Sequence, residues 1–192
     1  MPNKKEAILE TAVRYIAEQG GSFSTEQIAS DLGCSQSLIF RYYHTKDGLM
    51  SACFDWICHE LRLVLEEVEI PQVLSKESID GYILDVWRAY CDYLESRNHV
   101  ASAYMYFVST GWKYPRGYGS AETVLEKILG DDYERITDVY PDFIFAAEYV
   151  IMISNVFAAG KFIEWKGDED AARKFEMILM HGIFGMDSER IK

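Results

Sequence analysis

Residues 25–46 decide the fold, and they read TEQIASDLGCSQSLIFRYYHTK. The first part, Thr25–Leu32, has helical spacing and ends at Gly33, a residue type that adopts a positive φ at little cost. Ser35 can then cap a second short helix, Gln36–Tyr43. Two short helices joined by a tight turn form a helix-turn-helix.

The composition of the second helix fits the major groove of DNA, which this helix enters in a helix-turn-helix while the first helix supports it. Gln36 and Arg41 match the edges of adenine and guanine, and an apolar side chain such as Leu38 can meet a thymine methyl group. Donors suited to phosphates are carried by Thr25, Tyr42 and Lys46. On spacing alone, a helical hairpin that only packs is an equally good alternative.

Charge points to the same part of the chain. The 192 residues carry a formal net charge of -12, which excludes an overall basic coat. Residues 1–50 account for only −1 of this charge, and the stretch from Leu32 to Lys46 contains no acidic residue. A contact with a polyanion is therefore expected in this stretch.

The run from Ile28 to Leu49 resembles the DNA-binding signature of the TetR family of transcriptional regulators. That signature opens with IA-x-x-x-G-V-S and continues with an aromatic residue, a variable residue, His or Tyr, an aromatic residue and, three positions later, Lys. The matching residues here are Phe40, Arg41, Tyr42, Tyr43 and Lys46. Cys34 replaces the usual Val and Phe40 the usual Tyr, so one hydroxyl that could contact DNA is missing.

The resemblance, which covers about residues 3–50, implies a role for each matching position. The residues that would face the bases are Gln36, Ser37, Leu38, Phe40 and Arg41. The residues that would hold phosphates are Thr25, Tyr42 and Lys46, helped by Lys4 and Lys5. The core of the domain would contain Ile28, Leu32, Ile39 and Tyr43. For Arg41, the alternative is a solvated surface arginine.

The rest of the chain continues the helical pattern, so we expect an all-α fold of about nine helices. The ranges expected are about 3–19, 25–32, 36–43, 46–68, 79–94, 100–112, 120–129 and 141–165, with a last helix after residue 168. We divide the chain into a helix-turn-helix DNA-binding domain of three helices, residues 1–48, and a helical ligand-binding and dimerisation domain, residues 49–192.

The last two predicted helices are the expected dimer surface. Residues 143–165 are apolar nearly all round and contain small residues that allow close helix approach. Two such helices from each of two chains would form a four-helix bundle, and the resemblance implies the same. A dimer with few basic residues per copy would read a roughly palindromic double-stranded operator. The alternative is a core formed within one chain.

Aromatic residues are concentrated in the second domain, where ten of the 13 tyrosines lie between residues 82 and 149. We expect them to line a cavity for a small-molecule effector, since buried tyrosines need partners for their hydroxyls. The candidate ligand-binding residues are Trp87, Tyr90, Tyr104, Phe107, Trp112 and Tyr149. Glu148 and Asn155 are candidate polar anchors, which would suit an organic cation. The alternative is an aromatic-rich core.

Signals for other chemistry are weak. No catalytic constellation can be identified, and Cys53, Cys58 and His59 do not converge on one metal ion, so we expect no enzyme, metal or cofactor. The absence of a disulfide pattern and of a signal peptide suggests a cytoplasmic protein without a membrane partner.

The leading hypothesis is a dimeric, sequence-specific DNA-binding regulator, specifically a repressor released by a ligand. The alternative is a small helical enzyme or ligand-binding protein with a vestigial helix-turn-helix.

Overall fold

The computed structural model describes residues 4–110, 126, 129–143, 145–147 and 149. These residues form α-helices and one 3-10 helix, without strands, which confirms the all-α prediction. The elements are α1 (Lys4–Gln19), η1 (Gly20–Ser22), α2 (Thr25–Asp31), α3 (Gln36–Tyr43), α4 (Lys46–Glu66), α5 (Lys76–Ser96), α6 (Asn98–Ser109) and α8 (Asp132–Val139).

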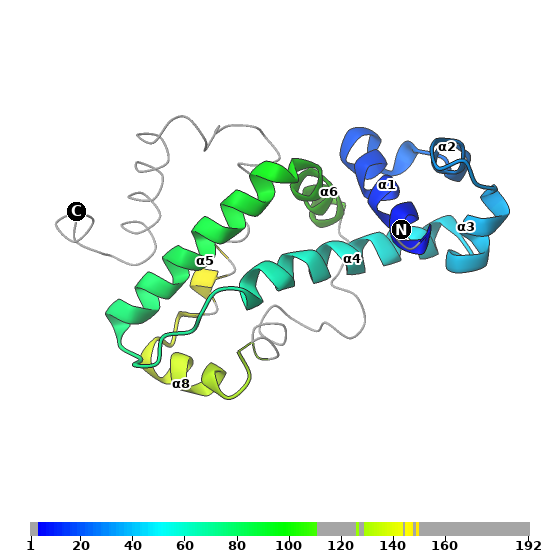
Figure 1. Cartoon of the computed structure of the whole chain (residues 1–192). Coiled ribbons are helices and arrows are strands. Elements are labelled where there is room, and N and C mark those ends of the chain that lie inside the picture. Colours follow the sequence, from blue (N-terminus) through cyan, green and yellow to red (C-terminus); the bar gives the residue numbers. More distant parts are fainter. Residues whose placement is uncertain (1–3, 111–125, 127–128, 144, 148, 150–192) are drawn as a thin grey trace.

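The first three α-helices and η1 lie together at one end of the molecule, and we call them the head (Figure 1). The long helix α4 leads from the head to α5, and α8 lies near the start of α5 at the far end. Between the end of α5 and the head lies α6, which packs along α1. The fourth helix and α6 therefore both connect the head with the remainder of the described chain.

The head folds as its turn residues predict. Gln27 N donates to Ser24 Oγ at 3.1 Å and Ser24 N donates to Gln27 Oε1 at 2.7 Å, which is the predicted capping box. Gly33 has a φ of 57°, so a residue without a Cβ atom fits the turn between α2 and α3. Ser35 lies at the N-cap of α3, but its hydroxyl contacts that of Ser37 at 2.9 Å rather than a backbone amide.

Buried apolar residues form two separate clusters. The first cluster joins the buried apolar residues of the head with residues of α4, α6 and the last turns of α5, among them Phe54, Ile57, Tyr90, Leu94, Tyr104 and Phe107. The second cluster contains Ile79, Tyr82, Ile83, Trp87, Cys91, Leu129, Ile136, Phe143 and Ala146. The long helix α5 contributes to both clusters, so it joins the two ends of the molecule.

Some boundaries differ from the prediction. The helix expected at 100–112 begins at Asn98, and α8 was not predicted at all. Ile136 is the only fully buried residue of this eight-residue helix, and Tyr133 and Tyr140 pack partly buried against the same cluster, so its apolar face is too short to stand out as a long stripe. Most of the helices predicted at 120–129 and 141–165, and the whole of the last one after residue 168, lie outside the described residues, and in the described part helical structure begins again at Phe143.

Candidate nucleic-acid interface

Helix α3 packs one face into the head and exposes the opposite face. Ile39 and Tyr43, one turn apart, are buried at 1% and 6% relative exposure. The predicted base-contacting residues Gln36, Ser37, Phe40 and Arg41 are exposed, and Leu38 is half-buried. The side chains whose polar groups could bind base edges therefore lie outside the buried core.

Two of the predicted contact residues bind each other across the helix-turn-helix. Gln36 Nε2 donates to Thr25 Oγ1 at 2.7 Å, which ties the first turn of α3 to the first turn of α2. Thr25 is buried, whereas Gln36 is exposed. The structure thus brings these two predicted residues together, and the hydroxyl hydrogen of Thr25 and the amide oxygen of Gln36 remain for other partners.

Lys46 holds the end of the head in place. Its Nζ donates to the carbonyl oxygens of Gly21 and Phe23, both at 2.6 Å, and lies 4.6 Å from the centroid of the Phe23 ring. An ammonium group has three N–H donors, so one donor remains for a phosphate. The side chain therefore has a structural role in addition to the role predicted from the sequence.

The remaining predicted contacts surround α3. The Arg41 guanidinium lies 5.5 Å from the centroid of the Tyr42 ring, and Lys4 Nζ donates to the carbonyl oxygen of Leu32 at 2.9 Å. The hydroxyl of Tyr43 donates to the carbonyl oxygen of Lys5 at 2.8 Å, and burial raises the pKa of Tyr43. Tyr43 is thus a neutral core residue that anchors α3 to α1.

The described members of the predicted ligand-binding set are divided between the two apolar clusters. Tyr90, Tyr104 and Phe107 belong to the first cluster, whereas Trp87 belongs to the second cluster and Tyr149 packs against it. Trp112, Glu148 and Asn155 lie outside the residues whose side chains are described. The described aromatic residues therefore serve two different cores.

One open groove of about 510 Å³ lies where α1, the end of α3 and α4 meet. Its lining consists of Lys5, Leu9, Tyr42, Tyr43, Gly48, Ala52, Asp55, Trp56 and His59. None of these residues was predicted to bind a small ligand, although Tyr42 and Lys5 were predicted to contact phosphates. Burial raises the pKa of Asp55. No sequence signal singled out this groove, because its lining combines residues of α1 with residues of α3 and α4, which lie more than 30 positions later in the chain.

Two cysteines of α4, Cys53 and Cys58, are buried thiols. Burial raises the pKa of Cys58 to about 12 and raises that of Cys53 as well, which keeps both thiols protonated at neutral pH. Within the described ranges, no group of three or more His, Cys, Asp or Glu side chains is placed to hold a metal ion. In the same ranges, no helix combines the length and the apolar character needed to cross a bilayer.

Comparison with known proteins agrees with this geometry. Residues 8–53 match the model of the bacterial regulatory proteins of the tetR family. A TetR-like transcriptional regulator from Rhodococcus sp. RHA1 has a similar structure, with a TM-score of 0.63 and 17% identity over 97% of this chain and 100% of that one. PfmR, a TetR family regulator from Thermus thermophilus, has a TM-score of 0.60 and 18% identity over 92% and 98%.

A third similar structure is described as the molecular basis for control of antibiotic production by a bacterial hormone. It has a TM-score of 0.59 and 18% identity, and the match covers 94% of this chain and 97% of that one. Identities this low show a common fold, while the family match is specific to the helix-turn-helix. Residues 8–53 therefore match the family model of the tetR regulatory proteins, and the chain as a whole has the fold seen in structures of TetR-family transcriptional regulators.

Proposed function

We propose that the protein is a dimeric, sequence-specific DNA-binding repressor that a small-molecule ligand releases from a palindromic operator. The observation that carries this proposal is the outward face of α3, where Gln36, Ser37, Phe40 and Arg41 are exposed around the buried anchors Ile39 and Tyr43. Exposed amide and guanidinium groups on a helix of this kind read base edges in the major groove.

The phosphate contacts are proposed for the residues at the edge of this face. Tyr42 is half-buried beside Arg41, and Lys46 has one donor beyond its two carbonyl partners. Thr25 carries a hydroxyl hydrogen at the start of α2, where backbone amides favour an anion. Together these groups would fix the register of the head on the duplex without reading its sequence.

Two copies are needed because one head has few positive charges to offer. A dimer through the last two helices would place two α3 helices about 34–36 Å apart, one turn of the duplex. The division into residues 1–48 and 49–192 belongs to this proposal, with the first part reading DNA and the second binding ligand and partner. A ligand that favours one packing of the second part would change the distance between the heads.

The effector is proposed to lie among the aromatic side chains that the sequence singles out. The similar structure whose description names control by a bacterial hormone supports a regulator of this type. A coupling of about 1–3 kcal/mol would change DNA affinity 5- to 150-fold, and DNA would weaken ligand binding by the same factor.

Selection from a library of random duplexes tests the proposal. We expect the purified protein to enrich a two-fold symmetric sequence and to sediment as a dimer. Enrichment of no sequence would favour the alternative, a helical enzyme or ligand-binding protein with a vestigial helix-turn-helix. Enrichment of an asymmetric sequence by a monomer would overturn the dimer model while keeping the reading role of α3.

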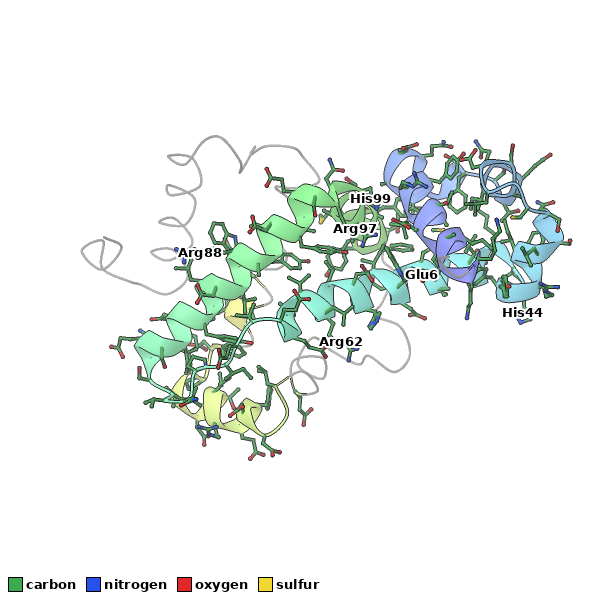
Figure 2. The ribbon with its side chains drawn as sticks, viewed as in Figure 1. Glu6, His44, Arg62, Arg88, Arg97 and His99 are labelled. Atoms are coloured by element: carbon green, nitrogen blue, oxygen red, sulfur yellow. The ribbon has the colours of Figure 1, made fainter. Side chains whose placement is uncertain are left out.

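Arg41→Ala refines the same experiment. We expect this variant to lose discrimination at one base-pair position, by about 1–3 kcal/mol, because a guanidinium–guanine pair contributes on that order. Arg88→Ala on α5 is the matched control, since it removes another exposed arginine, remote from the head (Figure 2). An Arg41→Ala protein that selects the wild-type sequence with unchanged preference would show that Arg41 is only a solvated surface residue.

A further inference from the structure

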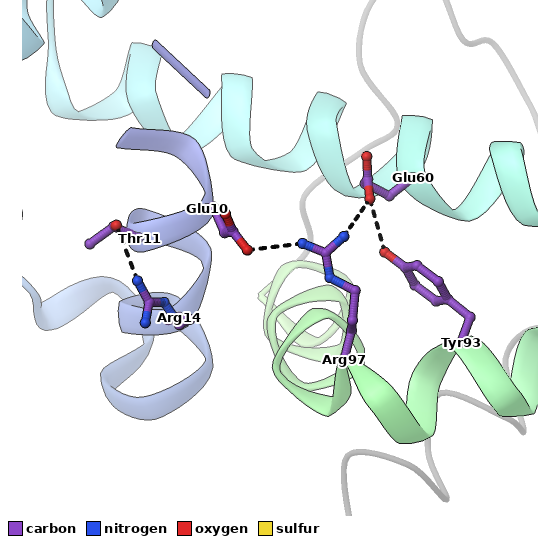
Figure 3. A network of polar contacts seen from close by, with 6 residues as sticks. All are labelled: Glu10, Thr11, Arg14, Glu60, Tyr93 and Arg97. Atoms are coloured by element: carbon purple, nitrogen blue, oxygen red, sulfur yellow. Dashed lines mark hydrogen bonds and ion pairs between the residues drawn. The ribbon is translucent and has the colours of Figure 1, made fainter. Parts of the chain in front are cut away.

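Arg97 occupies the joint between α5 and α6, where it is both the C-cap of α5 and the N-cap of α6. Its Nη1 donates to Glu60 Oε2 on α4 at 2.8 Å, and its Nη2 donates to Glu10 Oε1 on α1 at 3.0 Å (Figure 3). One guanidinium therefore binds a carboxylate of the head with one nitrogen and a carboxylate of α4 with the other.

The surroundings of Arg97 hold its guanidinium in one orientation. The centroid of the Trp56 ring lies 5.4 Å from its Cζ atom and that of the Tyr93 ring 5.9 Å. The hydroxyl of Tyr93 also donates to Glu60 Oε2, at 3.3 Å. Burial, followed by the charge of Glu60, raises the pKa of Tyr93, which keeps this donor protonated at neutral pH.

Partial burial makes these contacts stronger than ordinary surface ion pairs. The side chains of Arg97 and Glu60 are 29% and 18% exposed, so water screens their interaction only in part. Glu10 is 47% exposed, which makes the contact to the head the weaker of the two. By contrast, Arg62 and Glu66 pair within α4 and join no second element.

The same face of the head receives a second contact from α6. The ring of Tyr106 packs so closely on Gly20 that a Cβ atom there would lie 2.8 Å from the ring. Apolar packing of this kind is non-directional and permits small rotations. The two nitrogens of a planar guanidinium, each bound to a different helix, supply the directional part of the joint.

We propose that Arg97 is a positioning residue that fixes the orientation of the head relative to α4 and the α5–α6 joint, and thereby sets the half-site spacing that the dimer accepts. This inference rests on the proposed DNA-binding function. In this view, the ion pairs of Arg97 with Glu10 and Glu60 fix the separation of the two α3 helices in the dimer. Without these ion pairs, each head rocks on its apolar contacts and tolerates a wrong spacing.

The test compares the selected operator with a version that has one extra base pair at its centre. That insertion moves the half-sites about 3.4 Å further apart and rotates one against the other. The readout is the spacing ratio, which is the dissociation constant for the insertion variant divided by that for the selected operator. The dissociation constant for a single half-site is measured as well. For Arg97→Ala and for Glu10→Gln we expect the spacing ratio to fall at least about fivefold, with single half-site binding unchanged.

Two controls separate positioning from simple destabilisation. Arg62→Ala removes an arginine of similar exposure that pairs within one helix, and it should keep the wild-type ratio. Glu10→Gln added to Arg97→Ala should have no further effect, because the contact it removes is already gone. If Arg97→Ala does not fold, Glu10→Gln decides the question, since it keeps the shape of the site and removes only the charge that binds Arg97.

A wild-type ratio in a folded Arg97→Ala or Glu10→Gln protein would overturn the inference and leave the proposed function intact. An equal loss of affinity for the operator, its insertion variant and the single half-site would also overturn it, because that pattern reports a damaged head. A wild-type protein that selects no duplex would instead refute the proposed function, and the inference with it.

Discussion

The head and the second cluster use their side chains in different ways. In the head, aliphatic residues such as Ile8, Ile16 and Ile28 make up most of the core, and the outer face of α3 is largely exposed. In the second cluster, Tyr82, Trp87 and Phe143 are themselves the core. Asp80, at 2% exposure, is buried at the same end of the molecule, on α5.

Because of this difference, a function can be inferred more directly for the head than for the second cluster. Exposed polar residues that lie outside the core of the head, such as Ser37 and Arg41, are available to a partner outside the chain. Aromatic residues that fill a core can be explained by packing alone, so they do not by themselves indicate a ligand. The proposed DNA-contacting face of α3 is therefore better supported than the proposed effector site.

The largest expected effect tests whether the first cluster is one core across the head and α6. Phe107 is fully buried, and its ring centroid lies 4.9 Å from that of Phe54. Phe107→Ala should lower the free energy of unfolding by about 3–5 kcal/mol, because it leaves a cavity in this core. Amide hydrogen exchange should show that α2 and α3 lose protection together with α6.

A matched truncation in the second cluster sharpens this comparison. Ile136→Ala on α8 removes another fully buried side chain and should lower protection in α8 and the first turns of α5. Unchanged protection of α2 and α3 in the Phe107→Ala protein would show that the head folds by itself, which would support an independent domain over residues 1–48.

The next effect concerns a residue with two roles. Lys46→Ala removes two charge-assisted hydrogen bonds to backbone carbonyls, so we expect the free energy of unfolding to fall by about 3 kcal/mol. If the third donor binds a phosphate, the slope of log affinity against log salt also falls by about one. Urea denaturation and binding at several salt concentrations measure the two roles separately, and an unchanged slope would leave Lys46 with the structural role alone.

The sequence predicts the head well because short-range chemistry determines it. Ser24 and Gln27 cap α2, Gly33 makes the turn, and Ile39 marks the inward side of α3, all within one short stretch. The two carbonyl partners of Lys46 could not be predicted, since Gly21 and Phe23 approach it only when the head is folded.

Contacts between distant segments were missed for the same reason. Arg97 meets Glu10 across 87 positions of sequence, and no periodicity connects them. Helix α8 was missed because it is only eight residues long, so its apolar face of Tyr133, Ile136 and Tyr140 spans about two turns. Spacing reports the contacts within a helix, while contacts between helices depend on how the helices cross.

A smaller effect is expected where α6 meets the turn after α1. The Cβ atom of Gly21→Ala would overlap the hydroxyl oxygen of Tyr106, so we expect a loss of about 2 kcal/mol from overpacking. Tyr106→Phe removes that oxygen and leaves the next ring atom at 3.5 Å, an ordinary contact. The double variant should therefore recover most of the loss in thermal denaturation. Failure of Tyr106→Phe to rescue Gly21→Ala would place the strain in the backbone instead.

The smallest expected effect is a gain in stability at the end of α3. His44 has a φ of 64°, which is unfavourable for a residue with a Cβ atom, by about 1–2 kcal/mol. His44→Gly removes this strain but adds about 0.5–1 kcal/mol of backbone entropy cost, so the net gain should be about 0.5–1 kcal/mol. His44→Ala keeps the Cβ atom and should gain nothing. Urea denaturation of both variants measures the difference. Equal stabilities of His44→Gly and His44→Ala would show that the turn between α3 and α4 holds no backbone strain.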